Sequence, residues 1–216
     1  MTNRRDFLGI LGAGAALPAI LPPFPTNASL PPVLAEFDMS WVDQIAKPHK
    51  FVIDSASIDD ASGLWRAVAL MDQYKEAFGT YPNEMGAVLV LRHEAIILTM
   101  DHSHWEKDGV GEASGMKDRD DKWVTRNPVG PPTADARPSE ARYTLQGFQA
   151  MGGIVLACNF AFGGYVVGKY RKDGVSYADA RKEALTHLLP GVILQPSGFF
   201  ATVRAQQAGC AAFFNG

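Results

Sequence analysis

Short, continuous apolar runs alternate along this chain with longer segments whose apolar residues recur at helical spacing. A continuous run of about four to eight residues predicts a strand that is covered on both faces. Five such runs occur, at residues 50–55, 86–91, 153–157, 191–195 and 211–214. The helical spacing predicts four helices, over residues 59–78, 139–151, 177–189 and 197–208.

The first predicted helix carries Leu64, Val68 and Met71 on one face, and Asp59 or Asp60 is its expected cap. Strands and helices follow one another in the order βαβαβαβαβ. This order predicts an α/β fold, with an open, mainly parallel five-stranded sheet and helices on both faces.

One segment, residues 147–168, carries no charge and with 22 residues is long enough to cross a bilayer. Six glycines, together with Gln149 and Asn159, interrupt it. We therefore expect a helix end, a buried strand and a helix start, not a membrane span.

A long polar insertion, residues 101–142, separates the second and third predicted strands. Connections in such folds usually have about two to six residues, and longer ones are often lids or contact surfaces. Two interpretations are open for it. It is either a solvated excursion, or it packs in part through Trp105 and Trp123.

The N-terminus resembles a twin-arginine export signal, with Arg4 and Arg5, an apolar stretch over residues 9–21 and a small residue at Ala28. The apolar stretch, interrupted by a proline, is too short to span a membrane, although an uncleaved tail or a retained anchor are alternatives. The resemblance implies a signal at 1–28, an exported, periplasmic protein and no stable membrane span after cleavage. A lead-in, 29–49, would then precede the domain at 50–216, with Trp41 and Val42 packing on it.

The composition of the chain and the absence of several sequence motifs argue against some classes of function. The 216 residues are 47% hydrophobic, and 20 basic residues are scattered among 23 acidic ones for a net charge of -3. Such a chain predicts one domain that needs no metal or disulfide to fold, and its charges do not predict nucleic-acid binding. No G-x-S-x-G, P-loop or Cys-x-x-Cys motif occurs, so the usual grounds for a hydrolase, an NTPase or a thioredoxin are missing.

Polar side chains follow the predicted strands where a parallel sheet binds ligands, at the carboxyl ends. Asp54, His93, Cys158 and Ser197 all lie at or directly after such ends. Cys158 also opens a helix, whose positive dipole end favours a thiolate. Alternatively, Cys158 is simply a small buried hydrophobe.

Two segments around these positions resemble DsrE-like proteins, which include the sulfur-relay subunits of tRNA thiolation and sulfur oxidation. Residues 145–164, LQGFQAMGGIVLACNFAFGG, are similar to their helix, strand and cysteine segment, and 189–209, LPGVILQPSGFFATVRAQQAG, to their closing strand, turn and helix. Residues 50–91 match more loosely. The resemblance implies an α/β sheet, homo- or hetero-oligomers, and a cysteine at Cys158 that carries sulfur as a persulfide.

In such chemistry Cys158 is the nucleophile, and His93 is either a nearby base or a structural histidine. Backbone amides at Asn159 and at Ser197–Gly198 are expected to stabilise an anionic sulfur ligand. Two functions follow. The favoured one is an exported binding or assembly module that uses the insertion to contact an unknown ligand or protein. The alternative is a sulfur carrier acting through Cys158, and whether the chain is an enzyme stays open.

Neither a metal nor a cofactor is expected. The segment 101–106, DHSHWE, offers donors, but on a helix only pairs such as His102 with Glu106 share a face, and two ligands do not close a metal site. The two cysteines, Cys158 and Cys210, are predicted at opposite ends of parallel strands, so we expect no disulfide between them.

Overall fold

The computed structural model describes residues 37–58, 61–134 and 137–215. The expected signal, the first part of the lead-in and the expected caps Asp59 and Asp60 lie outside these residues. Five parallel strands form one sheet in the order β4-β3-β2-β1-β5. The strands are β1 His49–Ser55, β2 Met85–Leu91, β3 Ile154–Cys158, β4 Ile193–Gln195 and β5 Ala211–Asn215.

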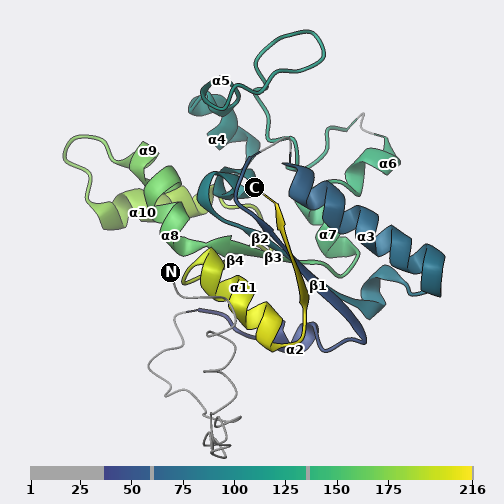
Figure 1. Ribbon diagram of the computed structural model, residues 1–216. Helices are drawn as coiled ribbons and strands as arrows, with labels where there is room; N and C mark the ends of the chain where they lie inside the picture. The colour runs from purple at the N-terminus through teal and green to yellow at the C-terminus, as the bar shows by residue number, and fades with distance from the viewer. Residues whose placement is uncertain (1–36, 59–60, 135–136, 216) are drawn as a thin grey trace, which may run out of the picture. The chain divides into compact units, whose positions relative to one another are not determined.

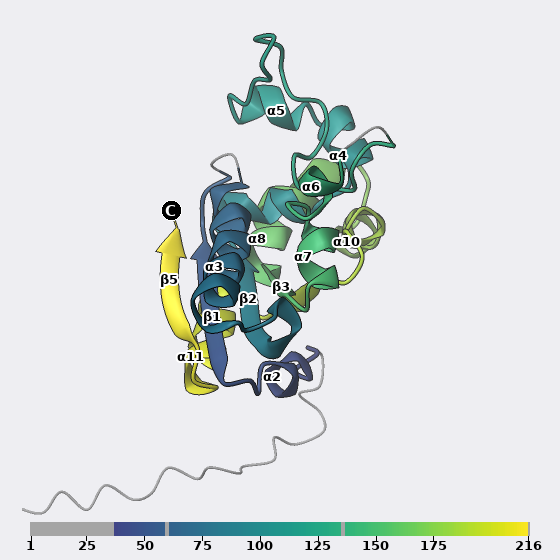
Figure 2. The same ribbon diagram turned by 90° about the vertical axis from the view of Figure 1, so that its right-hand side faces the viewer.

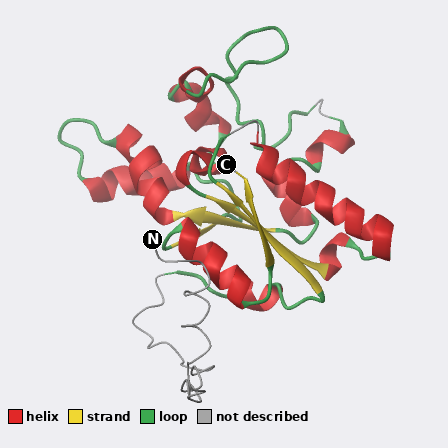
Figure 3. Cartoon of the chain, viewed as in Figure 1, coloured by secondary structure: helices red, strands yellow, loops and turns green. Residues whose placement is uncertain are grey.

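The order of the strands places helices on both faces of the sheet (Figures 1 and 3). The chain steps from β1 to β4 in one direction, so right-handed connections put all their helices on one face. It then returns past three strands to β5 through α11, Gly198–Gln207, which packs on the opposite face. The predicted open parallel α/β fold is therefore confirmed.

Alternate side chains of each central strand enter two separate cores. In β1, Phe51 and Ile53 pack beneath α3, Ser62–Phe78, while Val52 belongs to the cluster beneath α11. All residues of β2 and β3 are buried, as their continuous hydrophobicity predicts. The edge strand β5 differs, because Phe213 and Phe214 are exposed.

The lead-in packs as expected. Trp41 is fully buried in the core beneath α11, and Val42 packs against that core. Both belong to α2, Trp41–Gln44. The Gln195 side chain also donates a hydrogen bond from Nε2 to the carbonyl of Asp38, which ties the lead-in to β4.

The expected helix over 139–151 is wrong, since two short helices replace it: α6 Pro138–Ala141 and α7 Leu145–Ala150. Thr144 adopts an extended backbone between them and caps α7 by accepting a hydrogen bond from the Gly147 amide at 2.9 Å. Gly147 also lies so close to the preceding turn that a Cβ would stand 2.1 Å from the Ala141 carbonyl oxygen. This local cap and close approach break the helix.

The uncharged segment 147–168 divides as expected into the end of α7, the buried strand β3 and a helical stretch over 159–170. That stretch comprises α8 Asn159–Ala161, η5 Phe162–Val167 and α9 Gly168–Tyr170, and η5 is a π-helix. The next helix is α10, Tyr177–Thr186. Across residues 37–58, 61–134 and 137–215, no helix is both long and apolar enough to cross a membrane.

The insertion lies beyond the carboxyl edge of the sheet and contains α4 His102–Lys107 and α5 Val110–Ala113 (Figure 2). Short 3-10 turns, η3 Pro82–Glu84 and η4 His93–Thr99, flank β2. Apolar insertion residues join the core beneath α3: Trp105, Val110, Met116 and Val129. The interpretation of the insertion as a solvated excursion is thus wrong for its inner side.

Asn127 fixes this packing with a buried side chain. Its Nδ2 donates to the carbonyls of Leu98 and Met100 at 2.7 and 2.6 Å, and its Oδ1 accepts from the Val129 amide at 3.0 Å. The insertion is therefore held to η4 by hydrogen bonds as well as by apolar contacts.

Candidate functional site

The candidate site lies where the connections after two neighbouring strands separate. The chain leaves β3 toward the α3 face and leaves β4 toward the α11 face, and such a switch point opens a crevice at the carboxyl edge of the sheet. A cavity of about 610 Å³ occupies it, lined by residues that follow β2, β3 and β4. Its lining in the described part of the chain includes no residue of the insertion.

Cys158 supplies a thiol to the lining of this cavity. It is the last residue of β3 and the N-cap of the helical stretch 159–170. Its buried Sγ accepts a hydrogen bond from the Ala161 amide at 3.3 Å, and the residue also lines the cavity. A backbone donor and a helix start both favour negative charge on this sulfur.

His93 lies in the wall of the same cavity with an unusual backbone. Its φ is 52°, in the left-handed region that few residues other than glycine adopt, and such strain concentrates at functional sites. Its Nε2 lies 2.9 Å from the Tyr165 hydroxyl, which the π-helix η5 supplies. π-Helical turns are themselves frequent at functional sites.

Arg92 precedes His93 and is held by a buried carboxylate. Its Nε donates to Asp54 Oδ1 at 2.5 Å, while Thr202 Oγ1 donates to Asp54 Oδ2 at 2.8 Å. Its guanidinium carbon lies 4.8 Å from the centre of the Phe199 ring. Arg92 directly follows the second predicted strand and is a strand-end candidate for that reason, but the sequence assigns it no role in the site.

Aromatic side chains form much of the remaining wall: Phe160, Tyr165, Tyr177 and Phe199. Phe160 is 82% exposed, which is unusual for a residue of this size. Gly163 and Gly164 on the helix keep this wall open, and a Cβ at Gly163 would come within 2.8 Å of the Tyr177 hydroxyl. The cavity therefore has an apolar body beside its polar groups.

The three residues expected to bind an anionic ligand are placed differently from one another. Asn159 lines the cavity, and its Oδ1 accepts a hydrogen bond from Arg181 at 2.6 Å. Ser197 and Gly198 do not line it. Ser197 caps α11 by accepting from the Phe200 amide, and Gly198 packs so tightly on Arg92 that a Cβ would lie 2.5 Å from the Arg92 Cβ.

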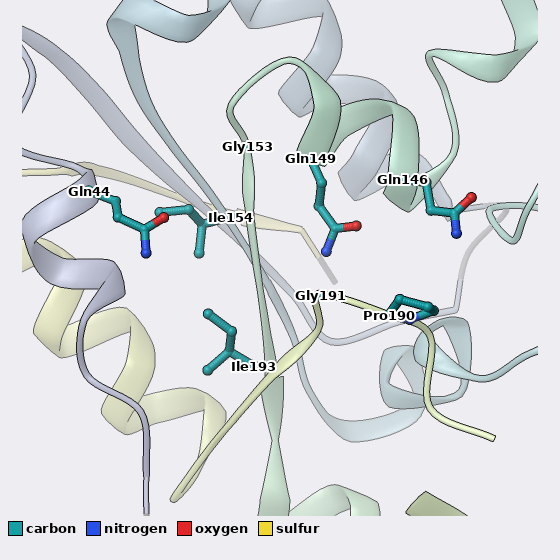
Figure 4. Close-up of a pocket in the computed structure, with 8 residues that line it drawn as sticks. All are labelled: Gln44, Gln146, Gln149, Gly153, Ile154, Pro190, Gly191 and Ile193. Carbon is teal, nitrogen blue, oxygen red and sulfur yellow. The ribbon is translucent and has the colours of Figure 1, made fainter. Parts of the chain in front are cut away.

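A second cavity, of about 440 Å³, lies at the amino ends of β3 and β4. Figure 4 shows Gln149 of α7 reaching toward Gly191, with Gln44 and Gln146 nearby. Among the residues that the structure describes, its lining contains no charged or nucleophilic side chain. For this reason we place the candidate chemistry at the carboxyl edge.

The histidines of the insertion are structural. His102 Nδ1 accepts from the Asn127 amide, and its Nε2 lies 2.8 Å from the Pro131 carbonyl oxygen. The buried His104 has Nδ1 2.8 Å from the Tyr170 hydroxyl and 3.0 Å from Asp108 Oδ2. No cluster of three or more potential metal-ligating side chains occurs in the described ranges.

We expect the buried His104 to make the free energy of unfolding depend on pH. Burial lowers the pKa of His104 below its usual value of 6.5, and Asp108 opposes this shift. The neutral ring is therefore favoured in the folded state, and the stability it contributes is complete above about pH 6.5 and lost as pH falls through the folded pKa. Urea titrations from pH 8 to pH 5 should show this loss.

His104→Gln should flatten this pH dependence between pH 8 and pH 5, even though its stability is lower throughout. An unchanged slope in the variant would show that other groups cause the loss.

The two cysteines are both free thiols and lie apart. Cys158 ends β3, whereas Cys210 directly precedes β5, and β2 and β1 separate these strands. Three steps across a sheet span roughly 14 Å, twice the reach of a disulfide. Burial raises the pKa of the Cys210 thiol, although Lys50 opposes this, so the reactive thiolate is disfavoured at Cys210.

Comparisons with known proteins give no match: no protein-family model, no curated protein and no solved structure is significantly similar to this chain.

Proposed function

We propose that this protein is a thiol-based sulfur carrier that holds sulfane sulfur as a persulfide on Cys158. The observation that carries the proposal is the position of the Cys158 sulfur. It accepts a backbone hydrogen bond at a helix start while its residue lines a large cavity at the switch point of the sheet. A reactive cysteine needs both features, stabilisation of the thiolate and access.

Loading transfers one sulfur atom without net oxidation. The Cys158 thiolate attacks the terminal sulfur of a donor persulfide, R–S–SH, and a new S–S bond forms as the old one breaks. The donor leaves as the thiolate R–S⁻, which takes the electron pair of the broken bond. In this scheme His93, oriented by Tyr165, accepts the thiol proton before attack.

Two further points support the proposal. The segments 145–164 and 189–209, which resemble DsrE-like sulfur-relay proteins, contribute most of the cavity wall, including Cys158 and Phe199. The alternative of a module that binds through its insertion loses support, because Trp105 and its apolar neighbours pack into this chain's own core. Export by the twin-arginine route would place the carrier in the periplasm, and oligomer formation belongs to the same proposal.

The test is the intact mass of the reduced, purified full chain after exposure to polysulfide. Wild type should gain the mass of one or more sulfur atoms, and Cys158→Ser should gain none. Cys210→Ser is the matched control, since it also removes one of the two buried thiols, and it should load like wild type. No uptake by the wild type, or uptake that depends on Cys210, would refute the proposal.

A further inference from the structure

The cavity that holds Cys158 is much larger than an inorganic sulfur donor requires. Its volume of about 610 Å³ lies within the range of sites that bury drug-sized ligands, roughly 300–1,000 Å³. Four aromatic side chains line it, and such walls bind apolar ligand bodies. A donor without an organic body would leave this apolar surface uncovered.

The charged groups that line the cavity determine whether a positively or a negatively charged ligand is favoured. Among the described residues that line the cavity, Arg92 is the one with a permanent charge, and no aspartate or glutamate is present. A cationic ligand would find no counterion here, whereas an anion would find one.

Arg92 is prepared to bind such an anion. Its Nε donates a hydrogen bond to Asp54, and its guanidinium carbon lies over the Phe199 ring. In the described residues, the two terminal nitrogens Nη1 and Nη2 have no hydrogen-bond partner. A guanidinium that is fixed in place while its outer donors stay unused suits a bidentate contact with an oxyanion.

We propose that the cavity takes organic anions in which an apolar body carries both the negative charge and the sulfane sulfur, such as organic thiosulfonates. This inference rests on the proposed sulfur-carrier function and names its donor class. The Cys158 thiolate attacks the outer sulfur of R–SO₂–S⁻, the S–S bond breaks, and the sulfinate R–SO₂⁻ leaves with the electron pair. No separate oxidant or reductant is needed, and Arg92 pairs with the sulfonyl oxygens before and after transfer.

The first test measures binding to the wild type, using unreactive probes in a calorimetric titration. Benzenesulfonate combines the anion with an aromatic body, benzylammonium reverses the charge, and sulfate lacks the body. We expect benzenesulfonate to bind at least about tenfold more tightly than either of the other two. Equal binding of benzylammonium or sulfate, or no binding of benzenesulfonate, would overturn the inference.

The second test removes the charge of Arg92. Because Arg92→Gln alone leaves the buried Asp54 without its partner, the variant is the pair Asp54→Asn with Arg92→Gln. Benzenesulfonate affinity should fall at least about tenfold in this pair and stay unchanged in Arg204→Gln, an arginine of α11 that does not line the cavity. Unchanged affinity in the pair would exclude Arg92 as the anion site.

Measurements of sulfur loading distinguish the proposed donor class from the proposed sulfur-carrier function. Wild type should gain one sulfur atom from benzenethiosulfonate, and the Asp54→Asn, Arg92→Gln pair should lose a larger share of its loading rate with benzenethiosulfonate than with polysulfide, which has no sulfonyl oxygens for Arg92 to pair with. Polysulfide loading without benzenesulfonate binding overturns the donor class and leaves the carrier function standing. Benzenesulfonate binding with no loading of Cys158 from either donor overturns the carrier function.

Discussion

Replacing Trp105 with alanine should lower the free energy of unfolding by about 4 kcal/mol, a large part of the stability of a domain of this size. Trp105 is 0% exposed and packs into the core beneath α3. Its Nε1 also donates to the Ile97 carbonyl at 3.1 Å, and this hydrogen bond would be lost, which leaves the Met100 amide as the donor to that carbonyl. Urea denaturation followed by circular dichroism measures the change.

The insertion supplies its own control, because its other tryptophan, Trp123, is 43% exposed and has Lys117 over its ring. Trp123→Ala should cost less than about 1 kcal/mol. Equal losses in the two variants would contradict the packing of the insertion, and two small losses would mean that α4 does not belong to the core.

Arg92→Gln should be nearly as damaging, with an expected loss of about 3 kcal/mol. The Asp54 carboxylate is only 1% exposed, and without Arg92 the Thr202 hydroxyl is its one remaining side-chain hydrogen-bond donor among the described residues. An uncompensated buried charge is costly, because the protein interior solvates it poorly. Denaturant titrations at pH 7 report this loss directly.

A double-mutant cycle shows whether the lost charge pair is the cause. Adding Asp54→Asn to Arg92→Gln removes the stranded charge and should restore at least half of the lost stability. If the stability lost in the double variant equals the sum of the losses in the two single variants, Arg92 stabilises the fold through its contact with Phe199, independently of Asp54.

The sheet was predictable because its central strands are covered on both faces. Val52, Val88 and their neighbours are apolar without alternation for that reason, and the pattern identified the strands of the parallel sheet. The helix over 139–151 failed for a local reason. The helical spacing of apolar residues continues through Thr144, but the Thr144 side chain caps a new helix there. Spacing alone does not show whether a threonine lies inside one helix or begins the next.

The site was predictable in part. The rule that ligands meet the carboxyl ends of parallel strands selected Cys158, His93 and Asn159, and all three line one cavity. The partnership of Arg92 with Asp54 was not predictable, because it depends on the register in which Asp54 lies opposite Val90. Nor does the sequence show that the helix after Cys158 widens to a π-helix, which positions Tyr165 beside His93.

The pairing of β5 with β1 has a consequence for how the chain is made. Asn215 donates a hydrogen bond to Ser55 across 160 positions of sequence, and its carbonyl accepts one from the Ala56 amide. During synthesis on the ribosome, the outer edge of β1 therefore stays uncovered until β5 has emerged. Such late, distant contacts slow folding and leave an apolar strand edge open to other chains, so a nascent copy of this protein is a natural client for a chaperone.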